Sequence, residues 1–202
     1  MRKAIVVTDD TKYKQLVRYE GYPLLVLTKN YSDFKSDKRF HDFHKRVVIE
    51  SVDPSQYAVQ EKEEAQIESM TNVIDYLYKK GFDEIVILTD IKASSVDYLS
   101  YILLLKKYRH LKISFETEHE AIQYFEIGTH IIPKETSVSI SLVPFTDAVV
   151  SLDYIVDKKT SVKIDALSGP LKDIKLFQRI ALLKVESGAV ILIRKLGEIN
   201  EN

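Results

Sequence analysis

Residues 60–108 constrain the fold of this chain most strongly, because they read as a helix, a strand and a second helix in succession. Apolar residues recur at steps of three and four in the first segment and predict one buried helix face: Ile67, Met70, Val73, Ile74 and Leu77. Gly81 can adopt a positive φ and so can end that helix. Residues 84–88 form a nearly continuous apolar run, which is typical of a strand covered on both faces. This order of segments predicts a parallel α/β sheet.

Two aspartates follow the strand predicted at residues 84–88. Ligands of parallel α/β sheets bind outside the carboxyl ends of the strands, and here that end is formed by Thr89 and Asp90. Asp97 stands three residues after Ser94, a spacing that resembles a capping box at the start of a helix. We therefore interpret Asp97 as part of a helix cap and Asp90 as a candidate ligand contact.

The rest of residues 1–116 continues the α/β pattern. Further strands are predicted at Lys3–Thr8, Leu24–Thr28, Val47–Glu50 and Lys112–Glu116. A helix is expected at about Lys12–Tyr19. With the strand at residues 84–88 this makes five strands alternating with helical segments. The pattern predicts a three-layer α/β domain with a mainly parallel sheet over residues 1–116.

The sequence pattern changes in residues 117–202, where short β-rich runs replace the long helical patterns. Seven strands are predicted, at Ala121–Ile127, His130–Pro133, Val138–Pro144, Ala148–Ile155, Ser161–Ile164, Ile180–Val185 and Ala189–Ile193. Turn residues separate them, Gly128 and Gly188 among them. Short strands at this spacing are typical of a β-sandwich or a barrel. We expect a second, all-β domain over residues 117–202.

Composition limits the kinds of partner. The chain of 202 residues has 29 Lys and Arg against 30 Asp and Glu, a net charge of −1 that argues against nucleic acid or a polybasic membrane contact. It has no cysteine, which excludes disulfides and thiolate metal sites. No apolar run approaches the length of about 18 to 20 residues that a membrane span needs. The start, MRKAIVVTDD, indicates a strand and not a signal peptide, so a cytoplasmic protein is expected.

One histidine pair is a candidate for metal binding. His41 and His44 are three residues apart with Asp42 between them, and a helical turn would bring such ligands together. The flanking residues are basic, namely Lys38, Arg39, Lys45 and Arg46. The alternative is therefore a hydrated surface loop.

Carboxylates gather at the start of the first predicted helix. They are Glu61, Glu63, Glu64 and Glu68. Helical spacing puts three of them within one arc opposite the apolar face. Oxygen ligands of this kind can hold Mg²⁺. Equally, acidic residues in a first helical turn complement the helix dipole while they stay solvated.

Two familiar kinds of catalytic motif are absent. The six glycines form neither GxGxxG nor GxxxxGKS, so no glycine-rich phosphate loop is present. No serine stands in a nucleophile-elbow context. The tyrosines at helical spacing are better explained as core or subunit contacts than as base-stacking platforms.

Three stretches carry a family resemblance. GTHIIPKETSVSISLVPF at 128–145 is similar to the pattern G-x-h-x-I-x-K followed by a strand like SLIPL, and ESGAVILI at 186–193 is similar to a closing strand. EKEEAQIE at 61–68 stands where the family has EKDxTDxE. Together with the order of elements over almost the whole chain, these stretches resemble the bacterial type of thiamine pyrophosphokinase. The resemblance implies an α/β domain followed by a β-sandwich.

The resemblance also implies an activity. Members transfer a pyrophosphoryl group from Mg-ATP to the hydroxyl of thiamine, which gives thiamine diphosphate and AMP. They act as homodimers, with thiamine held between the sandwich of one subunit and the α/β domain of the other. Carried over to this chain, the expected Mg²⁺ ligands are Asp42, Glu61, Glu63, Glu64 and Glu68. Asp42 and Glu68 would be catalytic, and Lys62 and Asp90 would contact the nucleotide.

Several family positions are changed. The GDFDS motif best matches residues 41–45, HDFHK, which keep only the first aspartate. Ala65 and Gln66 replace a Thr-Asp pair, and Ser94 stands where the family has a phosphate-binding arginine. Three hypotheses remain: a divergent enzyme, a non-catalytic homodimeric relative with a ligand cleft, and a scaffold that contacts proteins through exposed tyrosines.

Overall fold

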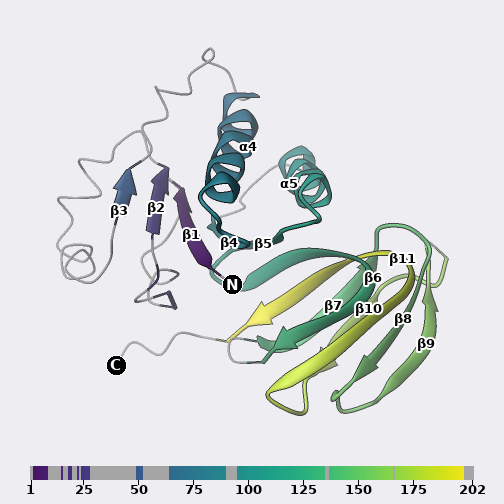
Figure 1. Ribbon diagram of the computed structural model, residues 1–202. Coiled ribbons are helices and arrows are strands. Elements are labelled where there is room, and N and C mark those ends of the chain that lie inside the picture. The colour runs from purple at the N-terminus through teal and green to yellow at the C-terminus, as the bar shows by residue number, and fades with distance from the viewer. Residues whose placement is uncertain are drawn as a thin grey trace. The chain divides into compact units, whose positions relative to one another are not determined.

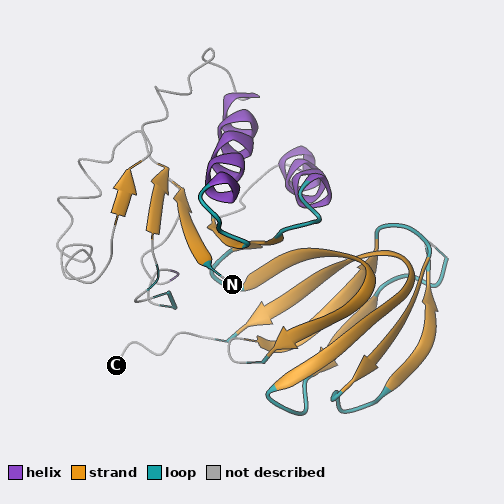
Figure 2. Cartoon of the chain, in the orientation of Figure 1, coloured by secondary structure: helices purple, strands orange, loops and turns teal. Residues whose placement is uncertain are grey.

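The structure is a computed structural model that describes residues 2–8, 15, 18–19, 22, 24–27, 49–51, 64–89, 95–134, 137–165 and 167–197. For residues 24–27, 49–51, 64–69, 95–97 and 137–138 it describes the backbone alone. The chain divides into two compact units, Met1–Glu118 and His119–Asn202. Strands predominate in the described part of the chain (Figure 2).

Five strands that pair in parallel are described in the first unit. They are β1 (Lys3–Thr8), β2 (Leu24–Leu27), β3 (Ile49–Ser51), β4 (Glu84–Leu88) and β5 (Lys112–Glu116). Their spatial order is β5-β4-β1-β2-β3, and every pairing between them is parallel. The sequence therefore predicted the five described strands of this unit. The described part of β3 extends one residue beyond its predicted end, to Ser51, while Thr28 and residues 47–48 lie outside the described residues. Parallel strands that are covered on both faces of the sheet can be recognised in a sequence because they are nearly continuous apolar runs.

Two helices are described in this unit, α4 (Glu64–Lys79) and α5 (Ser95–Lys107). Helix α4 lies between β3 and β4 in the chain, and α5 lies between β4 and β5, so both crossovers run in the same direction along the sheet. Right-handed crossovers in one direction place both helices on the same face of the sheet (Figure 1). The helix predicted at about Lys12–Tyr19 lies largely outside the described residues. The third layer that it would form stays a prediction.

Helix α4 buries the face that its spacing predicts. Met70, Val73, Ile74 and Leu77 are buried, while the side chain of Ile67 lies outside the described part. The helix ends at Lys79, and Gly81, two residues later, has a φ of 81°. The amide of Phe82 donates to the carbonyl of Leu77 and the amide of Gly81 to that of Tyr78, at 3.0 and 2.9 Å. This pair of bonds is a Schellman motif, which confirms the predicted role of the glycine.

A buried carboxylate ties together three strands at their amino ends. Glu84 of β4 is opposite Lys3 of β1 and Lys112 of β5, and its oxygens lie 2.8 Å and 3.1 Å from the two Nζ atoms. Burial opposes ionisation of Glu84, but the two ammonium groups outweigh burial and hold its pKa below the usual range. The three residues fix the register of these strands.

Replacing Glu84 by glutamine is expected to lower the free energy of unfolding by about 1–2 kcal/mol at neutral pH, since two ammonium groups lose their carboxylate. Because the folded pKa is depressed, this stabilisation is present above the ordinary value of 4.5 and is lost as the pH falls through the folded pKa. Urea unfolding at a series of pH values checks this. A difference between wild type and variant that persists unchanged into strong acid would contradict it.

The second unit is all β. Its strands are β6 (Glu120–Pro133), β7 (Ser137–Pro144), β8 (Ala148–Asp153), β9 (Lys159–Ile164), β10 (Leu171–Lys175) and β11 (Ile180–Leu196). All the pairings described within this unit are antiparallel, and β11 pairs with β6, β7 and β8. Over all described strands the pairing is therefore mixed and not mainly parallel.

Two pairs of predicted strands are each one long strand. The segments predicted at Ala121–Ile127 and His130–Pro133 are joined in β6, and those predicted at Ile180–Val185 and Ala189–Ile193 are joined in β11. The glycines between them do not end the strands. The register between β6 and β11 shifts between Val185 and Ala189, so Gly188 lies in a β-bulge that bends the strand.

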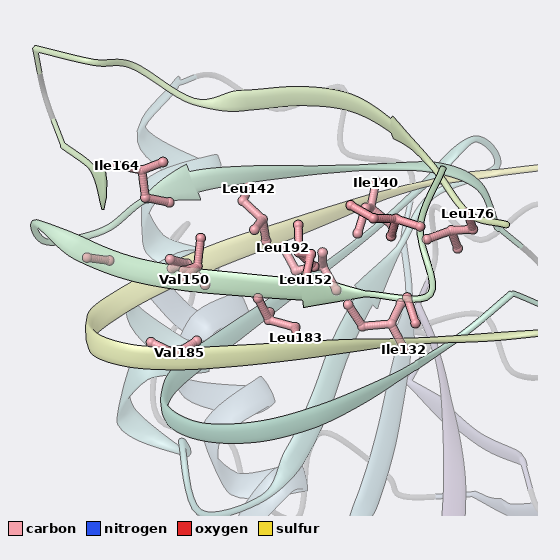
Figure 3. Close-up of a cluster of buried hydrophobic side chains, with 14 residues drawn as sticks. Ile132, Ile140, Leu142, Val150, Leu152, Ile164, Leu176, Leu183, Val185 and Leu192 are labelled. Carbon is pink, nitrogen blue, oxygen red and sulfur yellow. The ribbon is translucent and has the colours of Figure 1, made fainter. Parts of the chain in front are cut away.

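The bend of the long strands encloses one apolar core (Figure 3). Its most buried members include Leu142 of β7, Leu152 of β8, and Leu183 and Leu192 from the two halves of β11. Both halves of β11 therefore line the same core. The strands join through continuous ladders, and the two separate sheets of a sandwich stay a prediction. In the part of the chain that is described, neither helix has the length and apolar character needed to cross a membrane.

Candidate functional site

The strand order of the first unit indicates the sheet edge at which a ligand is expected. Chain connections leave β1 toward β2 and β3 on one side, while β4 and β5 lie on the other (Figure 1). In such sheets a ligand binds outside the carboxyl ends of the two strands where the order reverses, here β1 and β4. The described residues at these ends are Thr8 and Thr89, which are 8% and 2% exposed.

The two strands are linked at this end by a side chain. The hydroxyl of Thr8 donates a hydrogen bond to the carbonyl of Leu88, with an oxygen–oxygen distance of 3.0 Å. The bond adds to the parallel ladder that pairs Val7 with Leu88. Buried backbone acceptors need such partners, and this one holds the ends of β1 and β4 together.

A buried glutamine caps the neighbouring strand ends. Gln15 is 1% exposed, and its Nε2 donates to the carbonyl oxygens of Thr89 and Glu116 at 3.2 and 3.0 Å. The amide of Thr89 also donates to the carbonyl of Glu116 at 3.0 Å. A single side-chain amide thus joins the carboxyl ends of β4 and β5.

The carboxylate of Glu116 lies next to this junction and is also buried, with 3% of the residue exposed. The hydroxyl of Tyr19 donates to its Oε2, and the hydroxyl of Ser114 donates to its Oε1 at 3.3 Å. Arg18 donates from Nη2 to the carbonyl of Glu118 at 2.9 Å. The carboxyl edge is thus a network of mutually bonded polar groups, which favours one fixed geometry.

The residues predicted from sequence to form the site are only partly covered by the structure. Asp42, Glu61, Lys62, Glu63 and Asp90 lie outside the described residues, as do His41 and His44. Glu64 and Glu68 stand in the first turns of α4, but their side chains are outside the described part. Their assignment to a metal site therefore stays a prediction. Among the described side chains, no group of three or more His, Asp or Glu could hold a metal ion.

Sequence reasoning missed Gln15, Tyr19 and Glu116. A signal for Glu116 was available, because it ends a predicted strand just as Thr89 follows one. The same rule that selected Asp90 would have selected Glu116. Gln15 has no comparable local signal, since its partners are 74 and 101 residues away in the chain.

Comparison with known proteins gives a consistent fold. Thiamine pyrophosphokinase from Bacillus subtilis superposes with a TM-score of 0.66 at 17% identity, over 97% of this chain and 100% of that one. Thiamin pyrophosphokinase from Geobacillus thermodenitrificans gives 0.67 at 14% identity, over 96% and 97%. The yeast enzyme gives 0.58 at 9% identity, over 97% and 86%. No protein-family model and no curated protein matches the sequence.

At these identities the likeness shows the fold, which is that of the thiamine pyrophosphokinases. The resemblance inferred from the sequence is confirmed at this level. The low identity agrees with a divergent chain.

Proposed function

We propose that this protein transfers a pyrophosphoryl group from Mg-ATP to thiamine, giving thiamine diphosphate and AMP. The observation that supports this most strongly is the likeness to thiamine pyrophosphokinases, which extends over 97% and 96% of this chain and nearly all of theirs. In this reaction the hydroxyl oxygen of thiamine bonds to the β-phosphorus of ATP. The bond between that phosphorus and the oxygen of the α-phosphate breaks, AMP leaves with the electron pair, and the hydroxyl proton passes to a base.

The carboxylates predicted from sequence have suitable chemistry for this reaction. Mg²⁺ takes oxygen ligands, and Asp42 with Glu61, Glu63, Glu64 and Glu68 would supply them. The ion supplies charge neutralisation on the phosphate oxygens. Asp42 and Glu68 are the proposed catalytic residues, and Lys62 and Asp90 the proposed nucleotide contacts. Asp90 directly follows Thr89, at the edge where the strand order reverses.

The two units have different proposed roles. We expect the unit Met1–Glu118 to hold the nucleotide and the unit His119–Asn202 to contribute to a thiamine site. Two copies of the chain are expected to form a homodimer in the cytoplasm. The ligand placement and the homodimer rest on the family resemblance, and the oligomeric state in solution directly tests the homodimer.

A second candidate is a non-catalytic homodimeric relative that binds a small ligand. The sequence changes favour it, because Ala65 and Gln66 replace a Thr-Asp pair and Ser94 replaces the phosphate-binding arginine of the family. Loss of a cation that faces the transferred group removes stabilisation from the transition state more than from the bound substrate. Ligand binding could therefore survive where catalysis has not.

Release of AMP from Mg-ATP, with and without thiamine and at near-stoichiometric protein, separates the two candidates. We expect AMP release that depends on thiamine and that falls by about a hundredfold in Glu68→Ala. Asp157→Ala is the matched control, since it removes an exposed carboxylate from the second unit and should leave the rate unchanged.

Equal rates in the wild type and Glu68→Ala would contradict the proposed role of Glu68. If thiamine raises the melting temperature but no AMP is released, the chain is a binding protein and the second candidate is correct. If neither thiamine nor Mg²⁺ with an ATP analogue raises the melting temperature, the first candidate fails, and the second fails for these two ligands.

A further inference from the structure

Gln15 holds the strand end from which the proposed nucleotide contact follows. Thr89 is the last described residue before Asp90, and both of its backbone polar groups are bonded. Its amide donates to the carbonyl of Glu116 at 3.0 Å, and its carbonyl accepts from Nε2 of Gln15 at 3.2 Å. These two bonds restrain the backbone of Thr89 at the carboxyl end of β4.

The other contacts of this junction restrain Gln15 itself. The same Nε2 donates to the carbonyl of Glu116 at 3.0 Å, so both protons of the amide are directed at strand ends. Tyr19, which follows Gln15 by four residues, donates to the carboxylate of Glu116. Two side chains from the segment after β1 are therefore anchored on the end of β5.

We propose that Gln15 is a positioning residue for the nucleotide, acting through the carbonyl of Thr89. This inference rests on the proposed function, in which the edge of β1 and β4 holds the nucleotide. Misplacement of a binding group by a fraction of an ångström lowers affinity, so loss of this restraint weakens nucleotide binding without removing a ligand contact. The polar chemistry recognised at this edge is that of a nucleoside triphosphate with its Mg²⁺.

A structural role alone predicts a different result. A buried amide that only satisfies two carbonyls lowers stability when it is removed and affects every ligand of the folded protein alike. A positioning role weakens binding of the nucleotide much more than binding of thiamine, because the second unit is expected to supply part of the thiamine site. The affinities for the two ligands therefore distinguish the roles.

The experiment compares Gln15→Leu with Tyr108→Phe in the full chain. Leucine has nearly the size of glutamine but no donor. Tyr108→Phe also removes a tertiary donor, because the hydroxyl of Tyr108, the residue after α5, donates to Asp75 of α4 at 2.8 Å, away from the strand ends. Calorimetry well below both melting temperatures measures the Kd for Mg²⁺ with a non-hydrolysable ATP analogue, and separately the Kd for thiamine.

We expect the Kd for the nucleotide analogue to rise about tenfold in Gln15→Leu and less than about twofold in Tyr108→Phe. The Kd for thiamine should stay within about twofold in both variants. Amide exchange at Thr89 should become faster in Gln15→Leu only, since its neighbouring restraint is lost.

Three outcomes would overturn the positioning role. They are an unchanged nucleotide Kd in Gln15→Leu, an equal loss in Tyr108→Phe, and an equal loss of thiamine affinity. If the wild-type chain itself binds no nucleotide, the proposed function fails together with the positioning role, and the wild-type measurement alone shows it. A failure of the positioning role by itself is seen when the wild type binds the nucleotide analogue and any one of these three outcomes is found.

Discussion

Replacing Gly188 by alanine is expected to destabilise the second unit by about 3 kcal/mol or more. Gly188 has a φ of 75°, and a Cβ atom there would lie 2.0 Å from the carbonyl oxygen of Asp147 and 2.8 Å from Cα of Ala148. Both are backbone atoms, so no side chain can move aside. The clash would separate the turn after β7 from the bulge of β11, where the amide of Phe145 donates to Ala189 at 2.9 Å.

Urea unfolding of Gly188→Ala and Gly169→Ala provides the test. Gly169 has nearly the same φ, 73°, but nothing lies within 4 Å of its missing Cβ. Gly169→Ala therefore reports the cost of the backbone conformation alone, about 1–2 kcal/mol. The additional loss in Gly188→Ala measures the clash. Equal losses in the two variants would show that contact with Asp147 does not matter.

Leu152→Ala should have the second large effect, a loss of about 3–4 kcal/mol in the free energy of unfolding. Leu152 is 0% exposed in β8 and belongs to the core that both halves of β11 line. Its truncation leaves a cavity between strands whose backbones are held by ladders on two sides, so the site can collapse only partly.

The same substitution at an exposed position is the matched control. Leu167 is 98% exposed, and Leu167→Ala should change the unfolding free energy by less than about 0.5 kcal/mol. Chemical denaturation followed by circular dichroism measures both variants. Similar losses at the two positions would contradict the assignment of Leu152 to the core.

The first unit was largely predictable because its signals are local. The spacing of Met70, Val73 and Leu77 predicts the first helix of the helix-strand-helix segment, and an apolar run predicts β4. Each pattern arises because those side chains are buried in the core. The end of α4 was also readable, since positive φ at Gly81 is a property of one residue.

The second unit was harder because its strands bend where a local rule predicts an end. Gly188 permits a bulge as readily as a turn, and only pairing with β6 and β8 decides between them. Strand β10 was missed entirely. Its sequence Leu-Lys-Asp-Ile-Lys is mostly charged, and Asp173 has a φ of 50°, features that are suited to the edge of a sheet and hide the apolar alternation.

Part of the candidate site was likewise predictable from local sequence, and part of it was not. The position of Thr89 and Asp90 follows from a rule about strand ends, whereas the role of Gln15 depends on pairing between segments far apart in the chain. A polar residue has no periodic pattern that would reveal its partner. The network around Glu116 therefore became visible only with the order of the strands.

The place of β11 in the chain has a consequence for biosynthesis. Among the described strands it comes last in the sequence, yet it supplies Ala181, Leu183, Val185, Val190 and Leu192 to the core. Until it emerges from the ribosome, the ladders described within the second unit are only those of β7 with β10 and of β8 with β9. Completion of this core must therefore wait until β11 has been synthesised, with open strand edges exposed to other nascent chains in the meantime. The first unit has no such delay, because its strands are complete before β6 is synthesised.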